Sequence, residues 1–131
     1  LLYCADHGED LIDDERDRFL HASPTTTAYQ LYVASLAWFS DAYRRNFPEK
    51  VAAAMANETA PATTHALFHT MADMASIQGR FISHEASLVS PEYDRTAPRR
   101  YLNDHNEAVP YMKTGLAPQD IEVFRKFSVE L

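Results

Sequence analysis

The sequence has one cysteine, three glycines and no long apolar run, and each of these scarcities excludes a class of structure. Cys4 has no second cysteine to pair with, which excludes an intramolecular disulfide and a zinc site built from several cysteines. No segment approaches the roughly 18 apolar residues that a membrane-spanning helix needs. The few glycines leave no phosphate-binding loop, and plentiful alanine, leucine and methionine favour helix.

Basic residues are also in the minority, since 12 Lys and Arg stand against 19 Asp and Glu, for a net charge of −7. The excess is concentrated in residues 1–17, which hold seven acidic residues and one basic residue. The remainder of the chain is nearly neutral. Nucleic-acid binding normally requires a basic stripe, and the sequence has none, so we expect neither a nucleic-acid nor a membrane partner.

A chain of 131 residues is long enough to bury a core without metal or disulfide support. We therefore expect a single helical domain over residues 1–131, with residues 1–17 as an acidic N-terminal segment. The chain begins with Leu, which fits a mature or trimmed product or a fragment of a longer protein. The expected compartment is the cytoplasm, unless a targeting segment has been removed.

Apolar periodicity predicts an all-α helical bundle built on two long helices. The first, about 24–46, has Ser23 as a natural N-cap and Pro24 as a natural first helical residue. Its apolar residues cover more than half of the helix circumference, which indicates a central element covered on several sides. The second, about 62–89, ends before Pro91.

Shorter helices are predicted at three further places. They occupy an N-terminal segment within residues 8–22, an alanine-rich middle segment after Pro48, and a C-terminal segment from Pro118. A fourth short helix is expected near residues 99–108. Strict apolar–polar alternation and hairpin turn dipeptides are absent, so no strand is predicted.

The second long helix carries His65, His69 and Asp73 at four-residue intervals, a spacing that suggests a metal site. The same face also carries serines and charged residues, which is typical of a solvent-exposed face. Asp73 would lie about 12 Å along the axis from His65, too far to share one zinc ion. We therefore expect the exposed face and no cofactor, and keep a metal site at His65 and His69 as the least favoured alternative.

Gln78 and Glu85 are predicted to point into the apolar side of the same helix. A buried polar group without a partner costs about 1–3 kcal/mol, so something must satisfy them. Three interpretations stay open. Glu85 lies beyond the core, or the pair forms a buried network, or this side is a subunit interface. Gly79 fits each of them, because it permits a close approach or a kink. The partners of a buried network would be tyrosines on one side of the first long helix: Tyr29, Tyr32 and Tyr43.

Helix length favours assembly with a partner. The two long helices would measure about 34 and 42 Å, whereas a compact domain of this size is about 36 Å across. Either Gly79 breaks the second helix, or the bundle is elongated and exposes a long face that another copy or another protein could cover.

Three functional hypotheses from different classes follow. The preferred one is a non-catalytic protein–protein interaction or self-assembly module, because no catalytic motif is present; its partner is itself or another protein, with a homo-oligomer expected. The second is a small-ligand-binding helical domain, and the third is metal binding through His65 and His69. The ligand pocket would combine the tyrosines above with four further side chains: Trp38, Phe39, Met74 and Phe81.

Overall fold

A computed structural model describes residues 1–21, 26–102, 105–110 and 116–129, and it shows mixed helices and strands. The chain divides into two compact units. We call Leu1 with Ala37–Arg99 the middle unit, and Leu2–Leu36 with Arg100–Leu131 the terminal unit. The predicted all-α bundle is therefore wrong.

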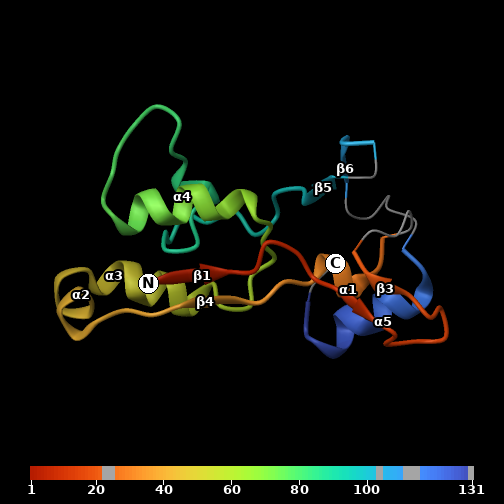
Figure 1. Cartoon of the computed structure of the whole chain (residues 1–131). Helices are drawn as coiled ribbons and strands as arrows, with labels where there is room; N and C mark the ends of the chain where they lie inside the picture. The colour runs from red at the N-terminus through yellow and green to blue at the C-terminus, as the bar shows by residue number, and fades with distance from the viewer. Residues whose placement is uncertain (22–25, 103–104, 111–115, 130–131) are drawn as a thin grey trace. The chain divides into compact units, whose positions relative to one another are not determined.

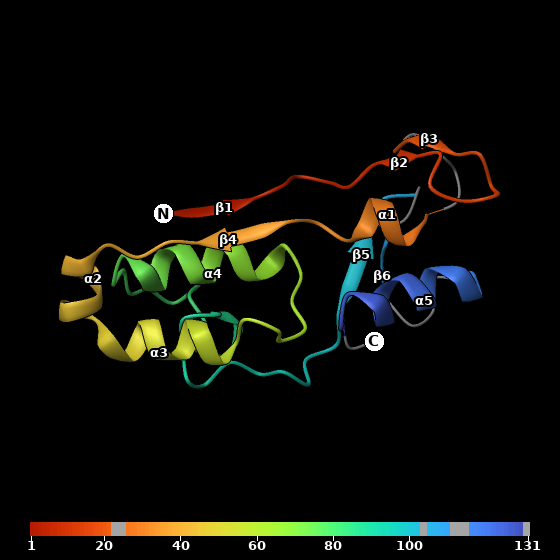
Figure 2. The same cartoon turned by 90° about the horizontal axis from the view of Figure 1, so that it is seen from below.

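The middle unit is helical. Ser40 caps the first of its helices, because its hydroxyl accepts a hydrogen bond from the Tyr43 backbone N–H at 3.2 Å. Figure 2 shows α2 turning directly into α3, which has Pro48 at its first position. A small apolar core consists of Phe39, Val51 and Val89. The elements are α2 (Asp41–Asn46), α3 (Pro48–Ala56), α4 (His65–Met74) and the 3-10 helix η1 (His84–Ala86).

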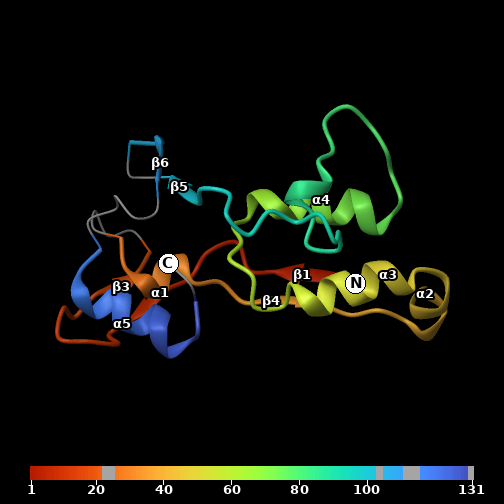
Figure 3. The ribbon, with the colours of Figure 1, turned by 180° about the vertical axis from the view of Figure 1, so that it is seen from behind.

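The terminal unit contains short strand pairs and two helices. Strand β1 pairs with β4, β2 pairs antiparallel with β3, and β5 pairs antiparallel with β6. Helices α1 and α5 contact each other, as Figures 1 and 3 show from opposite sides, and Phe124 of α5 is almost fully buried. The elements are β1 (Leu2–Cys4), β2 (Asp10–Leu11), β3 (Phe19–Leu20), α1 (Ala28–Leu31), β4 (Ser35–Ala37, whose last residue belongs to the middle unit), β5 (Arg100–Leu102), β6 (Ala108–Pro110) and α5 (Pro118–Lys126).

The first predicted long helix is replaced by α1, β4 and α2, with extended backbone between them. Thr27 and Ser40 each cap a separate short helix through their hydroxyl oxygens. Such side chains compete with the helical hydrogen-bond ladder, so a broad apolar pattern did not imply one continuous helix. The expected start at Ser23 and Pro24 lies outside the described residues.

The second predicted helix ends at Met74, fifteen residues early. Its end is a Schellman motif, in which Ile77 N–H donates to the Ala72 carbonyl at 2.9 Å and Ser76 N–H to the Asp73 carbonyl at 2.8 Å. Ser76 adopts a positive φ of 56°. The chain then makes a wide excursion over residues 75–83 and returns alongside α4 through η1 (Figure 1).

Two other segments that were predicted to be helical form strands instead. Residues within 8–22 contain β2 and β3, and residues near 99–108 contain β5 and part of β6. The middle and C-terminal helices do form, as α3 and α5. No helix among the described residues is long and apolar enough to cross a membrane.

Burial in this chain does not follow hydrophobicity. Among the described residues, eight apolar residues are buried, and so are nine polar or charged ones. Buried polar groups require hydrogen-bond partners, and networks around Asp10, Asp73 and Asp120 supply them. Large apolar side chains are meanwhile left in solvent, and this inversion is clearest on α4.

Candidate functional site

Helix α4 turns apolar side chains outward. Phe68 is 58% exposed and Met71 is 60% exposed, and His65 is exposed beside them. We call these three residues the α4 face. On the same helix His69 is only 7% exposed and Asp73 only 5%. The predicted orientation, with His69 and Asp73 in solvent and the apolar residues inside, is therefore wrong.

Asp73 is held inside by three partners. It accepts a hydrogen bond from the Ser87 hydroxyl at 2.7 Å, forms an ion pair with Lys50 at 3.0 Å, and lies 3.4 Å from His84 Nδ1. Burial alone would raise the pKa of the Asp73 carboxyl, but the hydrogen bonds from Ser87 and Lys50 outweigh burial and lower it. The carboxylate is thus charged and compensated beneath α4.

Further hydrogen bonds attach the returning segment to α4. His69 Nδ1 accepts from the Ser83 backbone N–H at 3.1 Å, and Thr70 Oγ1 accepts from the Leu88 N–H at 3.0 Å. Burial, together with neighbouring His65, lowers the pKa of His69, which suits a neutral imidazole acting as acceptor. Because residues 83–88 bind the polar side of α4, its apolar side is left facing outward.

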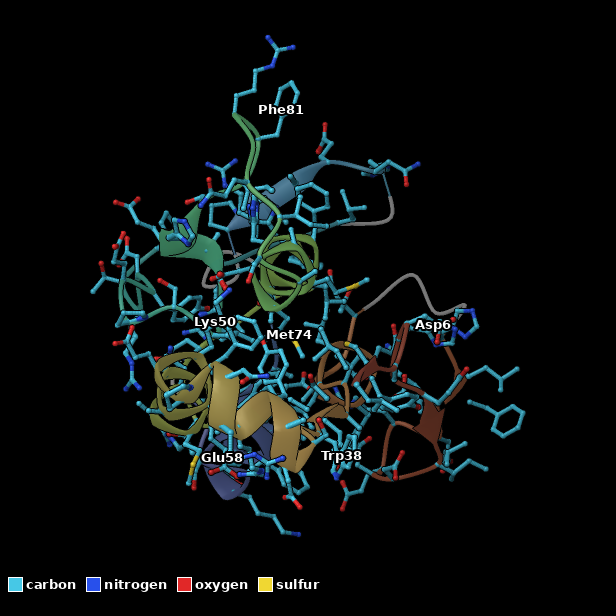
Figure 4. All side chains as sticks on the ribbon, turned by 90° about the vertical axis from the view of Figure 1, so that its left-hand side faces the viewer. Asp6, Trp38, Lys50, Glu58, Met74 and Phe81 are labelled. Carbon is cyan, nitrogen blue, oxygen red and sulfur yellow. The ribbon has the colours of Figure 1, made fainter. Side chains whose placement is uncertain are left out.

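The α4 face is also uncharged in its sequence. The helix HALFHTMADM contains one carboxylate, the buried Asp73, and no Lys, Arg or Glu. Lys50 reaches α4 from α3, and Figure 4 shows Lys50 and Met74 between these helices. The site therefore has a charged, hydrogen-bonded inner side and an apolar outer side.

The predicted interface residues lie in solvent. Gln78, Gly79 and Glu85 are all exposed, because they follow the end of α4. Of the three interpretations left open, the buried network of Gln78 and Glu85 does not form, since both side chains are exposed. A Cβ on Gly79 would meet only Ile82 Cδ1, at 3.9 Å, so no close approach explains this glycine. Whether these residues contact a partner stays a prediction.

The three tyrosines proposed as hydrogen-bond partners serve other purposes. The Tyr43 hydroxyl donates to the Met74 carbonyl at 2.8 Å within the middle unit. Tyr32 stacks on Phe127 in the terminal unit, with ring centroids 5.0 Å apart, and Tyr29 belongs to that unit as well. Within the middle unit, the Tyr43 hydroxyl thus bonds to the backbone of Met74 rather than to Gln78 or Glu85.

The residues proposed for a ligand pocket separate into two groups. Phe39 is buried, and Met74 packs against the core that contains it. Trp38 and Phe81 are exposed, and Figure 4 shows Phe81 at the tip of the excursion after α4, far from Met74. Arg80 lies over the Phe81 ring at 4.5 Å. The four side chains therefore do not line one pocket.

The proposed metal pair, His65 and His69, lies edge to face with ring centroids 4.9 Å apart. Within the part of the chain that the structure describes, the pair gains no third ligand to complete a metal site. Such a trio occurs instead at His7, Glu9 and His21, where the ligand atoms all lie within 4.8 Å of one another. Sequence reasoning missed this trio because it assigned residues 8–22 to a helix, which would have carried His21 away from Glu9.

The sequence matches no protein-family model, and no curated protein and no solved structure is similar to it.

Proposed function

We propose that the chain is a non-catalytic interaction module that associates with a second copy of itself through the α4 face. The observation that carries this proposal is the inversion of α4, which exposes Phe68 and Met71 while it buries His69 and Asp73. Apolar side chains gathered outward on one helix are typical of a surface that a partner covers.

A second copy is the partner that the charge pattern favours. In a two-fold dimer the same patch lies on both sides of the contact, so a patch with charges of one sign would face the same sign across it. The α4 face has no Lys, Arg, Asp or Glu, and it therefore packs against its own copy without repulsion. The net charge of −7 arises elsewhere.

The test is sedimentation equilibrium of the unaltered chain and of the double variant Phe68→Ser with Met71→Ser. Each serine removes apolar contact on the order of 1 kcal/mol, and a symmetric dimer contains four such sites. We expect the dissociation constant of the variant to rise at least about a hundredfold. Circular dichroism should be unchanged, because both side chains are exposed.

The matched control is Met55→Ser, which alters an equally exposed apolar residue on α3 in the same unit. Its association should equal that of the unaltered chain. Two results would contradict the proposal: a chain that stays monomeric at every concentration, or a double variant that associates as strongly as the unaltered chain.

A further inference from the structure

Strand register brings Glu9 and His21 together in the terminal unit. Strands β2 and β3 pair Asp10 with Leu20 and Leu11 with Phe19. One step beyond the first of these pairs, Glu9 faces His21, and the Glu9 Oε1 to His21 Nδ1 distance is 2.8 Å. Facing residues on antiparallel strands direct their side chains to the same side, so this contact follows from the pairing itself.

Gly8 then brings His7 to the same place. The Gly8 N–H donates to the Gln30 carbonyl at 2.9 Å, and a Cβ on Gly8 would lie 1.9 Å from the Tyr29 carbonyl oxygen. Residue 8 thus faces the backbone of α1. Its neighbours His7 and Glu9, two residues apart, direct their side chains to the opposite side. There His7 Nδ1 is 3.5 Å from Glu9 Oε1. The ring centroids of His7 and His21 are 3.9 Å apart.

We propose that His7, Glu9 and His21 bind a divalent transition-metal ion, with zinc as the ion that fits the donor set. Two imidazoles and one carboxylate form a known three-ligand set for zinc, whereas calcium and magnesium require mainly oxygen ligands. With metal–ligand bonds near 2.1 Å, two ligands on a tetrahedral ion are separated by about 3.4 Å. The observed separations require only small side-chain movements to reach that value.

The second oxygen of Glu9 gives independent support. Glu9 Oε2 is buried and has no hydrogen-bond partner among the described residues. A buried carboxylate oxygen without a partner is costly, and a cation held by both oxygens of Glu9 would remove that cost. Asp6 Oδ2 lies 3.7 Å from His7 Nε2 and would orient the His7 ring, as carboxylates commonly do behind histidine ligands.

The proposed metal site shares no residue with the α4 face. A bound ion would act on the structure of the terminal unit. The ion would join the segment before β2 to the residue after β3, next to the short β2–β3 ladder. Both imidazoles remain partly exposed, which leaves the fourth coordination position open to water.

The proposal is tested by titrating the full chain, at neutral pH, with zinc against a chromophoric chelator, and then with cobalt as a spectroscopic probe. We expect one equivalent of zinc to bind, a rise in unfolding temperature, and the visible absorption of tetrahedral cobalt. His7→Ala and His21→Ala should each weaken zinc binding at least about tenfold. Their circular dichroism should be unchanged, because both rings are exposed.

The matched control is His65→Ala, which removes an exposed histidine from the middle unit. Its zinc affinity should equal that of the unaltered chain. The proposal is overturned if no saturable binding appears at millimolar zinc, if His7→Ala and His21→Ala bind as tightly as the unaltered chain, or if His65→Ala abolishes binding. None of these outcomes depends on whether the chain dimerises, so the two proposals fail separately.

Discussion

Gly8 occupies a position that no larger residue fits. Its backbone lies so close to Tyr29 that an added Cβ would be 1.9 Å from the carbonyl oxygen, and real structures do not contain contacts that short. The neighbouring atoms are backbone, so a side-chain movement cannot relieve the overlap. A single missing methyl group therefore allows the N-terminal segment to lie against α1.

Gly8→Ala should destabilise the terminal unit by several kcal/mol, since overpacking against rigid backbone typically costs about 1–3 kcal/mol or more. Gly79→Ala is the matched control, because the added Cβ would meet only one side-chain atom at 3.9 Å. We expect Gly79→Ala to leave the free energy of unfolding nearly unchanged. Urea unfolding of both variants checks this, and equal midpoints would show that the close approach at Gly8 is absent.

Asp120 joins three separate segments of the terminal unit. Its carboxylate accepts two hydrogen bonds from Arg16, at 2.8 and 2.9 Å, and one each from the Ala28 and Ala117 N–H groups at 3.0 Å. Burial would raise the pKa of Asp120, but these hydrogen bonds lower it overall. The side chain is fully buried, so removal of its charge leaves the Arg16 guanidinium with Asp14 as its remaining ionic partner.

Asp120→Asn should cost on the order of 3 kcal/mol, because it breaks a buried ion pair. Glu122→Gln, on the same helix and exposed, should have little effect. Chemical denaturation of the two variants at pH 7 makes the comparison. If Asp120→Asn were as stable as Glu122→Gln, the hydrogen bonds of Asp120 would contribute nothing to the fold.

The lowered pKa values of Asp73 and Asp120 predict loss of stability in acid. Both groups bind protons more readily in the unfolded chain, where the pKa of Asp is about 3.9. Their contribution is complete above that value and is lost as the pH falls through it towards the folded pKa. The urea midpoint of the unaltered chain should decrease as the pH is lowered from 6 to 2.5. The midpoint of Asp120→Asn should decrease less over the same range. A pH-independent midpoint would contradict the assignment.

Two helices end in the same way, and neither end is visible in the sequence. In α5, Val129 N–H donates to the Phe124 carbonyl at 2.9 Å and Ser128 N–H to the Arg125 carbonyl at 3.0 Å, which repeats the motif at the end of α4. Ser128 and Ser76 both have φ of 56°. Glycine usually occupies this left-handed position. Because serine stands there instead, the sequence showed no stop before Pro91, and the predicted end of the second long helix was wrong.

Ser76→Gly and Ser128→Gly should each stabilise the chain by about 0.5–1 kcal/mol, because glycine relieves the left-handed strain at a smaller entropic cost. Ser83→Gly is the control, since Ser83 has an ordinary φ of −112° and gains nothing. Thermal unfolding of the three variants provides the comparison. Lower melting temperatures for Ser76→Gly and Ser128→Gly would contradict the Schellman assignment.

The elements that the sequence did predict carry strong boundary signals. Pro48 and Pro118 stand at the first positions of α3 and α5, where proline is favoured, and both helices form there. The short strands carried no such signal, since β2 and β3 each contain two residues and alternation needs a longer run. The trio of His7, Glu9 and His21 depends on that unseen pairing, so it was unpredictable for the same reason.

Across the described residues, polar networks occupy much of the buried interior. Asp73, Asp120 and Asn57 are buried and each bonds at least two groups distant in sequence, whereas Phe68, Met71 and other large apolar side chains remain outside. A chain with this distribution gains further free energy by covering its outer apolar surface. This explains why we expect a partner on α4.

Native mass spectrometry of the unaltered chain over a concentration series tests that expectation most directly. The account predicts a discrete species of twice the 14.9 kDa chain mass, growing with concentration and absent from the variant with serine at positions 68 and 71. A chain that remains at its single mass throughout the series, or a dimer that survives in the serine variant, would contradict the account.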